Sequence, residues 1–390
     1  MRGVMHARLK IGFIPLTDCA PLIVAKEEGF FTKHGLEVEL CKEASWSTIR
    51  DKLVFGEYQA VHMLAPMLLA TSLGAAYLKK PLMTAYSFGL NGNAVSVSNA
   101  LFGDLIAIEP NIVMYPERSA LVLRKVVMQR QKEQKEKLRF AVVFPFSMHY
   151  YLLHHWFKTV GLKVNEDVEI VVVPPSNVVQ ALEEGMIDGY CVGEPWNTHA
   201  VKNKVGVTVI TGYEIWNNAP EKVLGVKQSW VDKNPGVHDR LIIALYKASE
   251  WIDMPDNREK LKYYLSQSNY INAPVSSIKN ALEGQVCNPI CDTCRSIPNF
   301  SLPFKYQANF PWVSHAKWIL RQMVELKQIA ETTDVNEVAE GCYRPDIFRR
   351  VLQSHGIAVP SVNEKSEREH DAPWSLKILV RDSPFSRKSR

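Results

Sequence analysis

The chain has 390 residues, of which 46% are hydrophobic and 22% are charged, and its formal net charge is +5. Such a composition is typical of an ordinary globular protein with room for two domains. The positive excess allows an anionic partner but is too mild to indicate a nucleic-acid-binding surface by itself.

The start of the sequence carries no recognisable targeting signal. MRGVMHARLK leads straight into an apolar strand, without an apolar segment of signal-peptide length or a small-residue cleavage site. No apolar run approaches the roughly 18–20 residues that a membrane span needs. The seven cysteines, an odd number without paired spacing, are typical of a reducing compartment. We therefore expect a cytoplasmic protein that does not contact the membrane.

The N-terminal part of the chain alternates strand and helix patterns. Apolar and polar residues alternate at 35–41, as in a strand, whereas 19–31 has helical spacing. The expected order is a strand at 11–15, a helix at 19–31, a strand at 35–41, a helix at 47–55, a strand at 60–63 and a helix at 66–73. Strand, helix and strand in succession favour parallel pairing and the α/β class.

The middle of the chain continues this alternation. Strands at 82–87 and 94–97 flank an Asn-Gly-Asn turn. The basic second part of 116–139 indicates the solvated face of a helix rather than a nucleic-acid contact. Beyond it we expect a strand at 138–144, a helix at 147–160, a strand at 168–173 and a helix at 178–184.

The stretch 186–222 holds the densest local signals. An apolar strand at 186–192 ends at Gly193, and Glu194 with Pro195 opens a helix, where proline has no amide hydrogen bond to lose. A β-branched strand at 207–211 and Lys222 follow. A helix N-terminus favours anions through its free N–H groups and its dipole. We therefore predict that this stretch forms half of a pocket for a small anion, to which Lys222 adds a positive charge.

The C-terminal part is mainly helical. We expect a strand at 223–226, helices at 237–253, 257–267, 275–283 and 314–332, irregular structure at 284–313, and a late strand or tail at 376–380. The polar segment 361–390 is expected to be partly disordered. The economical architecture is two α/β lobes around a ligand cleft. Lobe I is predicted to comprise 8–95 and 211–360, and lobe II to comprise 96–210.

Two clusters invite a metal interpretation. Cys287, Cys291 and Cys294 have the C-x3-C-x2-C spacing of the iron–sulfur loop in radical-SAM enzymes, but that loop lies near the N-terminus there. A lone metal would need a fourth ligand, for which His315 is the near candidate, so plain loop thiols are favoured.

Three histidines lie within 147–160. His154 and His155 are adjacent, so they face different sides of a helix and favour structural roles. His149 follows a strand end, where α/β sheets present ligand contacts, and both a ligand and a structural role stay open. No nucleotide motif or nucleophile elbow is present, and no cofactor is expected. Composition alone makes Trp46 a core residue rather than a ligand contact.

Several motifs occur in order along residues 8–350: ASWSTIRDKL at 44–53, NGNAVSVS at 91–98, FPFSMHYYLLHHW at 144–156, DGYCVGEPWN at 188–197, IW…PEKV at 215–223, NFPWVSHAKW at 309–318 and YRPD at 343–346. Together they resemble the nitrate- and bicarbonate-binding proteins of ABC importers. This resemblance implies a bilobal periplasmic-binding-protein fold of type II, with an oxyanion held between the lobes.

The resemblance also assigns residues by motif position. The implied ligand-binding set is Trp46 as an aromatic wall, Asn93 and His149 as donors, the segment Val192, Gly193 and Glu194 for backbone amide contacts, and Lys222 as the cation. The last position is Lys in nitrate binders and Glu in the bicarbonate binder. A lysine offsets the charge of a permanent anion, so nitrate or nitrite is the expected ligand.

Because a leader is not evident, the chain most resembles the cytoplasmic nitrate/nitrite sensor of assimilation operons. Such a sensor would hold an RNA-binding antitermination protein without nitrate and release it when nitrate binds. We expect no enzyme activity and no direct nucleic-acid contact. The alternatives are the substrate-binding receptor of a nitrate importer, an enzyme like the thiamine-pyrimidine synthases, which would need a cysteine-rich iron motif, and a regulatory domain fused to a transporter ATPase.

Overall fold

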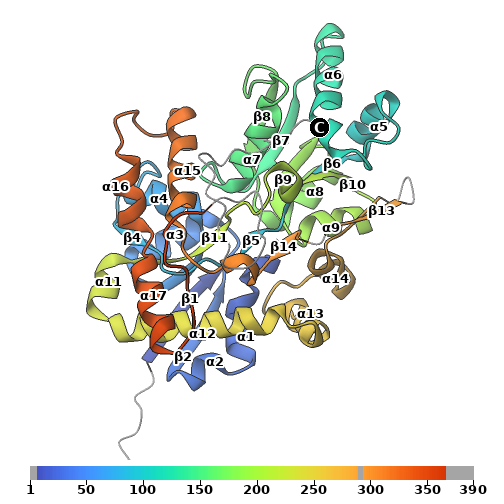
Figure 1. Cartoon of the computed structure of the whole chain (residues 1–390). Helices are drawn as coiled ribbons and strands as arrows, with labels where there is room; N and C mark the ends of the chain where they lie inside the picture. Colours follow the sequence, from blue (N-terminus) through green and yellow to red (C-terminus); the bar gives the residue numbers. More distant parts are fainter. Residues whose placement is uncertain (1–6, 289–292, 298, 366–390) are drawn as a thin grey trace, which may run out of the picture. The chain divides into compact units, whose positions relative to one another are not determined.

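The computed structural model describes residues 7–288, 293–297 and 299–365 (Figure 1). Its backbone contacts divide these residues into two compact units, each of which is described by itself. Unit 1 contains residues 7–90, Pro220–Asn272 and 302–365, and unit 2 contains Asn91–Ala219 with the described part of Ala273–Ser301. Thus 91–95, 211–219 and Ala273–Ser301, which the sequence analysis assigned to lobe I, belong to unit 2. They do so because their strands and helices contact one another and the sheet of unit 2.

Unit 1 is built on a five-stranded sheet with the order β2-β1-β3-β11-β4. Its strands are β1 (Ala7–Phe13), β2 (Leu36–Lys42), β3 (Ala60–Leu64), β4 (Leu82–Met83) and β11 (Lys222–Lys227). β1 is parallel to β2 and β3, as the strand–helix–strand order predicts. β11 is antiparallel to β3 and β4, so the sheet is mixed rather than wholly parallel. The sheet is mixed because β11 follows the segment Asn91–Ala219 of unit 2 in the chain and is not part of the N-terminal strand–helix–strand series.

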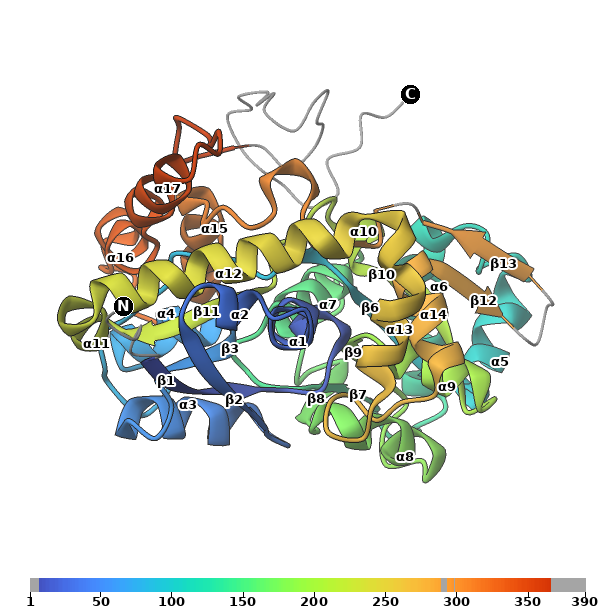
Figure 2. The ribbon, with the colours of Figure 1, turned by 90° about the horizontal axis from the view of Figure 1, so that it is seen from below.

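Helices cover both the sheet and one another in unit 1, and Figure 2 shows α12 passing across α1 and α2. The helical segments are η1 (Thr17–Cys19), α1 (Ala20–Glu27), α2 (Phe30–Lys33), α3 (Trp46–Phe55), α4 (Ala65–Leu73), α11 (Gln228–Lys233), α12 (Pro235–Asp253), η4 (Pro255–Asn257), α13 (Arg258–Ser266), η5 (Lys305–Gln307), α15 (Val313–Glu325), α16 (Val335–Cys342) and α17 (Pro345–Ser354). The single helix expected at 19–31 is two helices, because Gly29 adopts the left-handed conformation, with φ 71°, between them.

Unit 2 has its own five-stranded sheet, with the order β10-β6-β9-β7-β8. The strands are β6 (Asn93–Ser98), β7 (Leu138–Val142), β8 (Val168–Val172), β9 (Gly189–Gly193) and β10 (Gly206–Thr211). β7 is parallel to β8 and β9, whereas β6 is antiparallel to β9 and β10. Two further short strands, β5 (Leu90–Asn91) and β14 (Ser301–Leu302), lie where the chain passes from one unit to the other.

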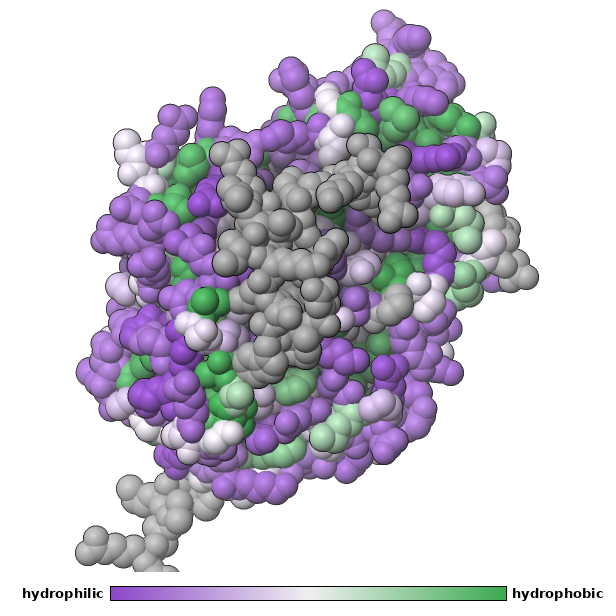
Figure 3. All heavy atoms as spheres, in the orientation of Figure 1, coloured by the Kyte–Doolittle hydropathy of each residue, from purple (hydrophilic) through white to green (hydrophobic). Residues whose placement is uncertain are grey.

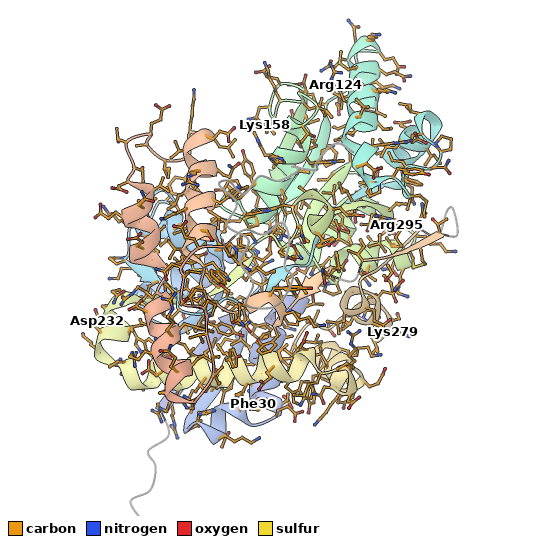
Figure 4. All side chains as sticks on the ribbon, in the orientation of Figure 1. Phe30, Arg124, Lys158, Asp232, Lys279 and Arg295 are labelled. Carbon is orange, nitrogen blue, oxygen red and sulfur yellow. A yellow bond between two sulfur atoms is a disulfide. The ribbon has the colours of Figure 1, made fainter. Side chains whose placement is uncertain are left out.

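The helical segments of unit 2 are α5 (Asn99–Ile108), η2 (Pro116–Arg118), α6 (Ser119–Lys132), α7 (Met148–Lys158), η3 (Pro175–Asn177), α8 (Val178–Glu183), α9 (Trp196–Lys202), α10 (Gly212–Ile215) and α14 (Val275–Glu283). α6 confirms the solvated basic helix: Arg124, labelled in Figure 4, and Lys125 and Lys132 are exposed. α5 has no counterpart among the expected elements. α9 begins at Trp196 rather than at Glu194, and the Glu194–Pro195 peptide bond before it is cis.

The segment 284–313, expected to be irregular, contains a β-hairpin. Its strands are β12 (Gln285–Asn288) and β13 (Thr293–Ser296), with Cys287 directly opposite Cys294. Arg295 of this hairpin, labelled in Figure 4, forms an ion pair with Glu214. Short polar strands without clear alternation gave the sequence pattern nothing to detect. Likewise, α16 and α17 were not expected, and the helix expected at 314–332 ends at Glu325. The expectations for 366–390, including a strand at 376–380, lie outside the described residues.

Candidate functional site: a buried charge cluster in unit 1 and a polar set in unit 2

Unit 1 contains a cluster of buried charged side chains around Lys222. Lys222 is the first residue of β11 and is only 1% exposed. Its Nζ lies 2.8 Å from Oδ2 of Asp18 and 2.6 Å from Oε2 of Glu221. The ammonium group expected to be a lone cation is therefore held by two carboxylates. Such pairing is what permits a lysine to stay charged inside a protein.

The sheet register explains why His62 joins this cluster. In the antiparallel pair, Lys222 lies opposite Leu64, and Leu224 lies opposite His62. Opposite residues, and residues two apart, share a face of a sheet, so Lys222 and His62 point to the same side. Asp18 lies in η1, just beyond the carboxyl end of β1. Its Oδ1 is 3.0 Å from Nε2 of His62, so this one carboxylate contacts both basic groups.

The charges of the cluster shift one another's protonation. Burial alone would raise the pKa of Asp18, but Lys222 and His62 outweigh burial and hold that pKa well below its ordinary value. Burial lowers the pKa of His62, and Asp18 opposes the change only in part. Burial would also lower the pKa of Lys222, whereas Asp18 and Glu221 raise it. At neutral pH, Asp18 and Lys222 are therefore ionised and His62 is neutral.

Aromatic rings surround the imidazole of His62. The ring of Trp46 lies 5.6 Å from it, and the ring of Phe88 lies 4.9 Å from it in an edge-on arrangement. Trp46 is the first residue of α3. Ser45 caps this helix, because its Oγ accepts a hydrogen bond from Thr48 N at 3.2 Å. Trp46 is 1% exposed, and within the described residues its Nε1 has no hydrogen-bond partner. A buried N–H group without a protein acceptor is a natural donor to a ligand.

Unit 2 brings together the polar residues expected from 91–98 and 188–197. Asn93 is fully buried at the start of β6 and lies directly opposite Gly193 of β9. The backbone N of Glu194 donates to the Gly92 carbonyl at 3.1 Å, and Nδ2 of Asn197 donates to the Val192 carbonyl at 2.8 Å. Antiparallel pairing of β6 with β9 therefore places Asn93 beside the backbone of the segment Val192, Gly193 and Glu194.

His149 is the second residue of α7 and is fully buried. Ser147 caps this helix by accepting a hydrogen bond from Tyr150 N at 3.1 Å. α7 contacts β9, and β9 runs parallel to β7, which precedes α7 in the chain. The N-terminal end of α7 and the carboxyl end of β9 therefore belong to the same edge of the sheet, as the sequence analysis expects for His149.

The side chain of Glu194 forms a hydrogen bond at the start of α9. Its Oε2 accepts a hydrogen bond from Thr198 N at 3.1 Å, and burial raises the pKa of the carboxyl to about 7 although the contact with Thr198 lowers it. Glu194 also lines a cavity of about 230 Å³ together with Thr198, Val201, Lys202, Lys204, Thr208, Asn280, Gln285, Val286, Cys287, Asn288, Thr293 and Cys294. An ionised carboxylate repels anions, and the backbone N–H of Glu194 already donates to the Gly92 carbonyl, so neither group of Glu194 is available to an anion.

The cysteine hypothesis requires correction. Cys287 and Cys294 form a disulfide across the hairpin, so they are neither plain loop thiols nor free thiolates for an iron–sulfur cluster. Cys291 lies outside the described residues. Cys19, Cys41 and Cys342 are free thiols. Within the described ranges, His, Cys, Asp and Glu side chains form no group of three or more suited to a metal ion.

Comparison with known proteins places this chain in a family. The sequence pattern of the NMT1-like family matches residues 3–266. The chain belongs to the NMT1-like family. Among individual relatives, this NMT1-like chain is 34% identical to the nitrate import ATP-binding protein NrtC of Synechocystis over 91% of its own length. It spans only about half of that relative, namely 51%.

Relatives of more similar length carry the name of nitrate/nitrite binding proteins. The NMT1-like chain is 30% identical to NrtA of Synechococcus elongatus, with 94% of this chain and 79% of NrtA covered. It is 29% identical to NrtA of Nostoc, with 94% and 81% covered. The crystal structure of the periplasmic nitrate-binding protein NrtA from Synechocystis PCC 6803 superposes with a TM-score of 0.83 at 26% identity, covering 92% of each chain. The predicted α/β periplasmic-binding-protein fold is thereby confirmed.

The surface of this NMT1-like chain is mainly polar where it can be seen. The face in Figure 3 is predominantly hydrophilic, and its hydrophobic areas are small and separated. Across the described ranges, every helix falls short of the length and hydrophobicity that a bilayer crossing requires.

Some members of the unit 1 cluster were missed by sequence reasoning. Trp46 and Lys222 were expected, whereas Asp18, His62 and Glu221 were not. A signal existed for Asp18, which follows the first strand at its carboxyl end, where α/β sheets carry functional groups. His62 within the apolar run AVHML was a second signal, because an ionisable residue in a buried strand needs a reason to be there.

Proposed function

We propose that this chain binds nitrate or nitrite without converting it. The observation that carries the proposal is the Lys222 ammonium of unit 1. It lies in the same cluster as the indole N–H of Trp46, which has no hydrogen-bond partner among the described residues. A planar, weakly hydrated oxyanion needs a cation and N–H donors in a dry, partly aromatic environment, and this cluster provides each of these. The names of the NrtA relatives as nitrate/nitrite binding proteins support the same ligand.

We also assign Asn93, His149 and the backbone of Val192 and Gly193 to anion recognition. Their support is the shared edge of the unit 2 sheet on which they lie. Charge-assisted hydrogen bonds contribute roughly 1.5–3 kcal/mol each. Three or four of them, less the cost of desolvation and ordering, predict an affinity of about −8 kcal/mol, which is roughly micromolar.

The decisive experiment is calorimetric titration of the purified protein with nitrate, nitrite and bicarbonate. Nitrate and nitrite should bind and bicarbonate should not, and ion chromatography should recover the bound anion unchanged. Trp46→Phe keeps the ring but removes the N–H group, so nitrate affinity should fall by about tenfold, the value of one hydrogen bond. Trp230→Phe on α11 is the matched control. Absence of nitrate and nitrite binding at millimolar concentration would end the proposal.

The physiological role that we favour is a substrate-binding receptor for nitrate import. Relatives named for nitrate import and nitrate binding support it. The Cys287–Cys294 disulfide supports it too, because structural disulfides persist mainly in oxidising compartments. Fractionation of producing cells should then recover the protein outside the cytoplasm with the disulfide formed. Recovery in the cytoplasm with reduced cysteines would contradict the receptor role.

A cytoplasmic nitrate/nitrite sensor is the second candidate, favoured by the free thiols of Cys19, Cys41 and Cys342. Such a sensor would bind an RNA-binding antitermination regulator and release it on binding nitrate. Linkage then requires nitrate and the regulator to weaken each other by one common factor. Measuring the size of the complex in a mixture of the two proteins, with and without nitrate, tests the idea. A complex that persists unchanged in millimolar nitrate would refute it.

A further inference from the structure

The cavity of about 230 Å³ in unit 2 is not explained by nitrate binding. Its lining residues come from α9, β10, α14 and the two strands of the β12–β13 hairpin, together with residues on either side of α9. These elements belong to unit 2 and contact one another, and Figure 2 shows α9 and α14 near the hairpin strands. The cavity is therefore a product of the packing within this unit.

The helix α9 presents one of its faces to the cavity. Thr198, Val201 and Lys202 line it, and their spacing of three and four residues places them on the same side of the helix. Lys204 follows in a left-handed turn, with φ 57°, and its carbonyl accepts a hydrogen bond from Asn99 Nδ2 at 2.7 Å. This bond fixes the backbone of Lys204, so both lysines belong to the C-terminal end of α9.

The charged side chains that line the cavity have a net positive charge. They are Lys202, Lys204 and Glu194. Both lysines are exposed, and neither forms an ion pair with another described residue. Burial raises the pKa of Glu194 to about 7, so the sum is +2 when this carboxyl is protonated and +1 when it is ionised. Glu194 precedes α9, whose length of about 9 Å separates the carboxyl from the lysine end. The lysine end therefore favours an anionic group.

The remaining lining groups suit a carbon chain with a polar end. Val201, Val286 and the Cys287–Cys294 disulfide are apolar, and the disulfide joins the two strands of this wall. Oγ1 of Thr293 is buried and has no hydrogen-bond partner among the described residues, so it can bond a ligand atom. The volume equals that of about seven liquid water molecules. A nitrate ion, with one nitrogen and three oxygens, would leave most of it unfilled.

We propose that this cavity is a second ligand site, which binds a small organic carboxylate with about four carbon atoms. Lys202 and Lys204 hold the carboxylate through charge-assisted hydrogen bonds. Val201 and Val286 contact the carbon chain, and Thr293 bonds the polar group at its other end. This ligand is distinct from the nitrate or nitrite of the proposed function, and its binding does not depend on that function.

Calorimetric titration of the full chain with three probes tests the ligand class. Succinate should bind with a dissociation constant of about 1 mM or lower. Succinamide, which has the same size without the charge, and inorganic phosphate, which has the charge without the carbon chain, should bind at least tenfold more weakly. Absence of succinate binding at tens of millimolar, or phosphate binding as tight as that of succinate, would overturn the proposal.

A titration in the presence of nitrate separates this site from the proposed nitrate site. Succinate should bind equally well with and without millimolar nitrate. If nitrate displaced succinate, the two anions would share one site and the second site would be refuted. If the protein bound succinate but neither nitrate nor nitrite, the proposed function would fail and the second site would stand, so the two failures are distinguishable.

Paired lysine variants test the position of the site. Lys202→Gln combined with Lys204→Gln keeps two polar side chains but removes both charges, so succinate affinity should fall at least tenfold. Lys125→Gln combined with Lys132→Gln is the matched control, because both lysines are exposed on α6 of the same unit. Equal losses of affinity in the two double variants, or no loss in the first, would overturn the assignment to this cavity.

A measurement on the unaltered protein covers the case in which the first double variant does not fold. Succinate should slow hydrogen exchange several-fold at the amides of α9 and β12 and leave those of β8 unchanged, because β8 does not line the cavity. Slowing that is confined to unit 1, or that is equal in β8 and β12, would overturn the proposal.

Discussion

At the scale of single residues, Asp18 contacts both basic groups of the unit 1 cluster. Asp18→Asn removes one negative charge near the proposed anion position, so nitrate affinity should rise by roughly tenfold or more. The same change should cost about 3 kcal/mol of unfolding free energy at pH 7, because one partner of Lys222 is lost. Titration calorimetry and urea unfolding measure the two effects. Asp104→Asn, an exposed position on α5, is the control.

The stability effect of Asp18 has a defined pH window. Its pKa is lower in the folded protein than its ordinary value of 3.8. A depressed pKa adds stability above the ordinary value, and this contribution is lost as the pH falls through the folded value. The difference between Asp18→Asn and the unaltered protein should therefore shrink only below about pH 4. A difference that is constant down to pH 2, or a weaker nitrate affinity, would contradict this account.

The pKa of Glu194 is shifted in the opposite direction from that of Asp18, because burial raises it from 4.5 to about 7 in the folded protein. Between these two values the unfolded chain loses a proton that the folded chain keeps, so stability falls as the pH rises. The loss should total about 3 kcal/mol and be complete above pH 7. Glu194→Gln should remove most of this slope in urea unfolding between pH 4.5 and 8. Glu183→Gln, exposed on α8, should leave it unchanged.

At the scale of elements, the β12–β13 hairpin is closed by the Cys287–Cys294 disulfide, and Val286 packs with Ile297 and Phe300. A crosslink over so short a loop is worth about 2–3 kcal/mol in the chain-entropy picture. Reduction, or paired Cys287→Ser and Cys294→Ser changes, should therefore speed hydrogen exchange of the hairpin amides by roughly 30-fold or more and leave β6 unchanged. Peptide mapping should find the crosslink. If the hairpin amides exchanged at the same rate with and without the disulfide, a local stabilising role of the crosslink would be refuted.

The same hairpin shows where sequence patterns fail. Strands and helices with a clear apolar period, such as β1, α3 and α14, were predicted within a few residues. The hairpin was not, because its register depends on a crosslink and on packing against distant Ala94 and Tyr213. The antiparallel direction of β11 was not predicted either, because strand direction in a sheet depends on contacts between residues distant in sequence.

The residues of the candidate site likewise include some that the sequence predicted and others that only the fold shows. Trp46, Asn93 and Lys222 were assigned through motif resemblance, and a local strand-end signal supported His149. Asp18 was not predicted as a partner of Lys222, because the segment Asn91–Ala219 of unit 2 lies between them in sequence. Only the fold shows that the ammonium already has two carboxylates.

At the scale of the whole molecule, an anion that binds only the folded chain must stabilise it. At a free concentration of 100 times the dissociation constant, this stabilisation is about 2.7 kcal/mol. Divided by the unfolding entropy expected for a chain of 390 residues, this free energy should raise the midpoint temperature of the calorimetric transition by about 3 °C.

The two units provide an internal control for that experiment. If they unfold in separate transitions, Asp18→Asn should lower the transition of unit 1, and loss of the disulfide should lower that of unit 2. Each variant thus identifies a transition without any assumption about its order. Nitrate should raise at least the transition that Asp18→Asn lowers, since the cation and the indole donor both lie in unit 1. Nitrate that moved only the transition of unit 2 would separate Lys222 from the anion, and the charge cluster would then have to be a purely structural feature of unit 1.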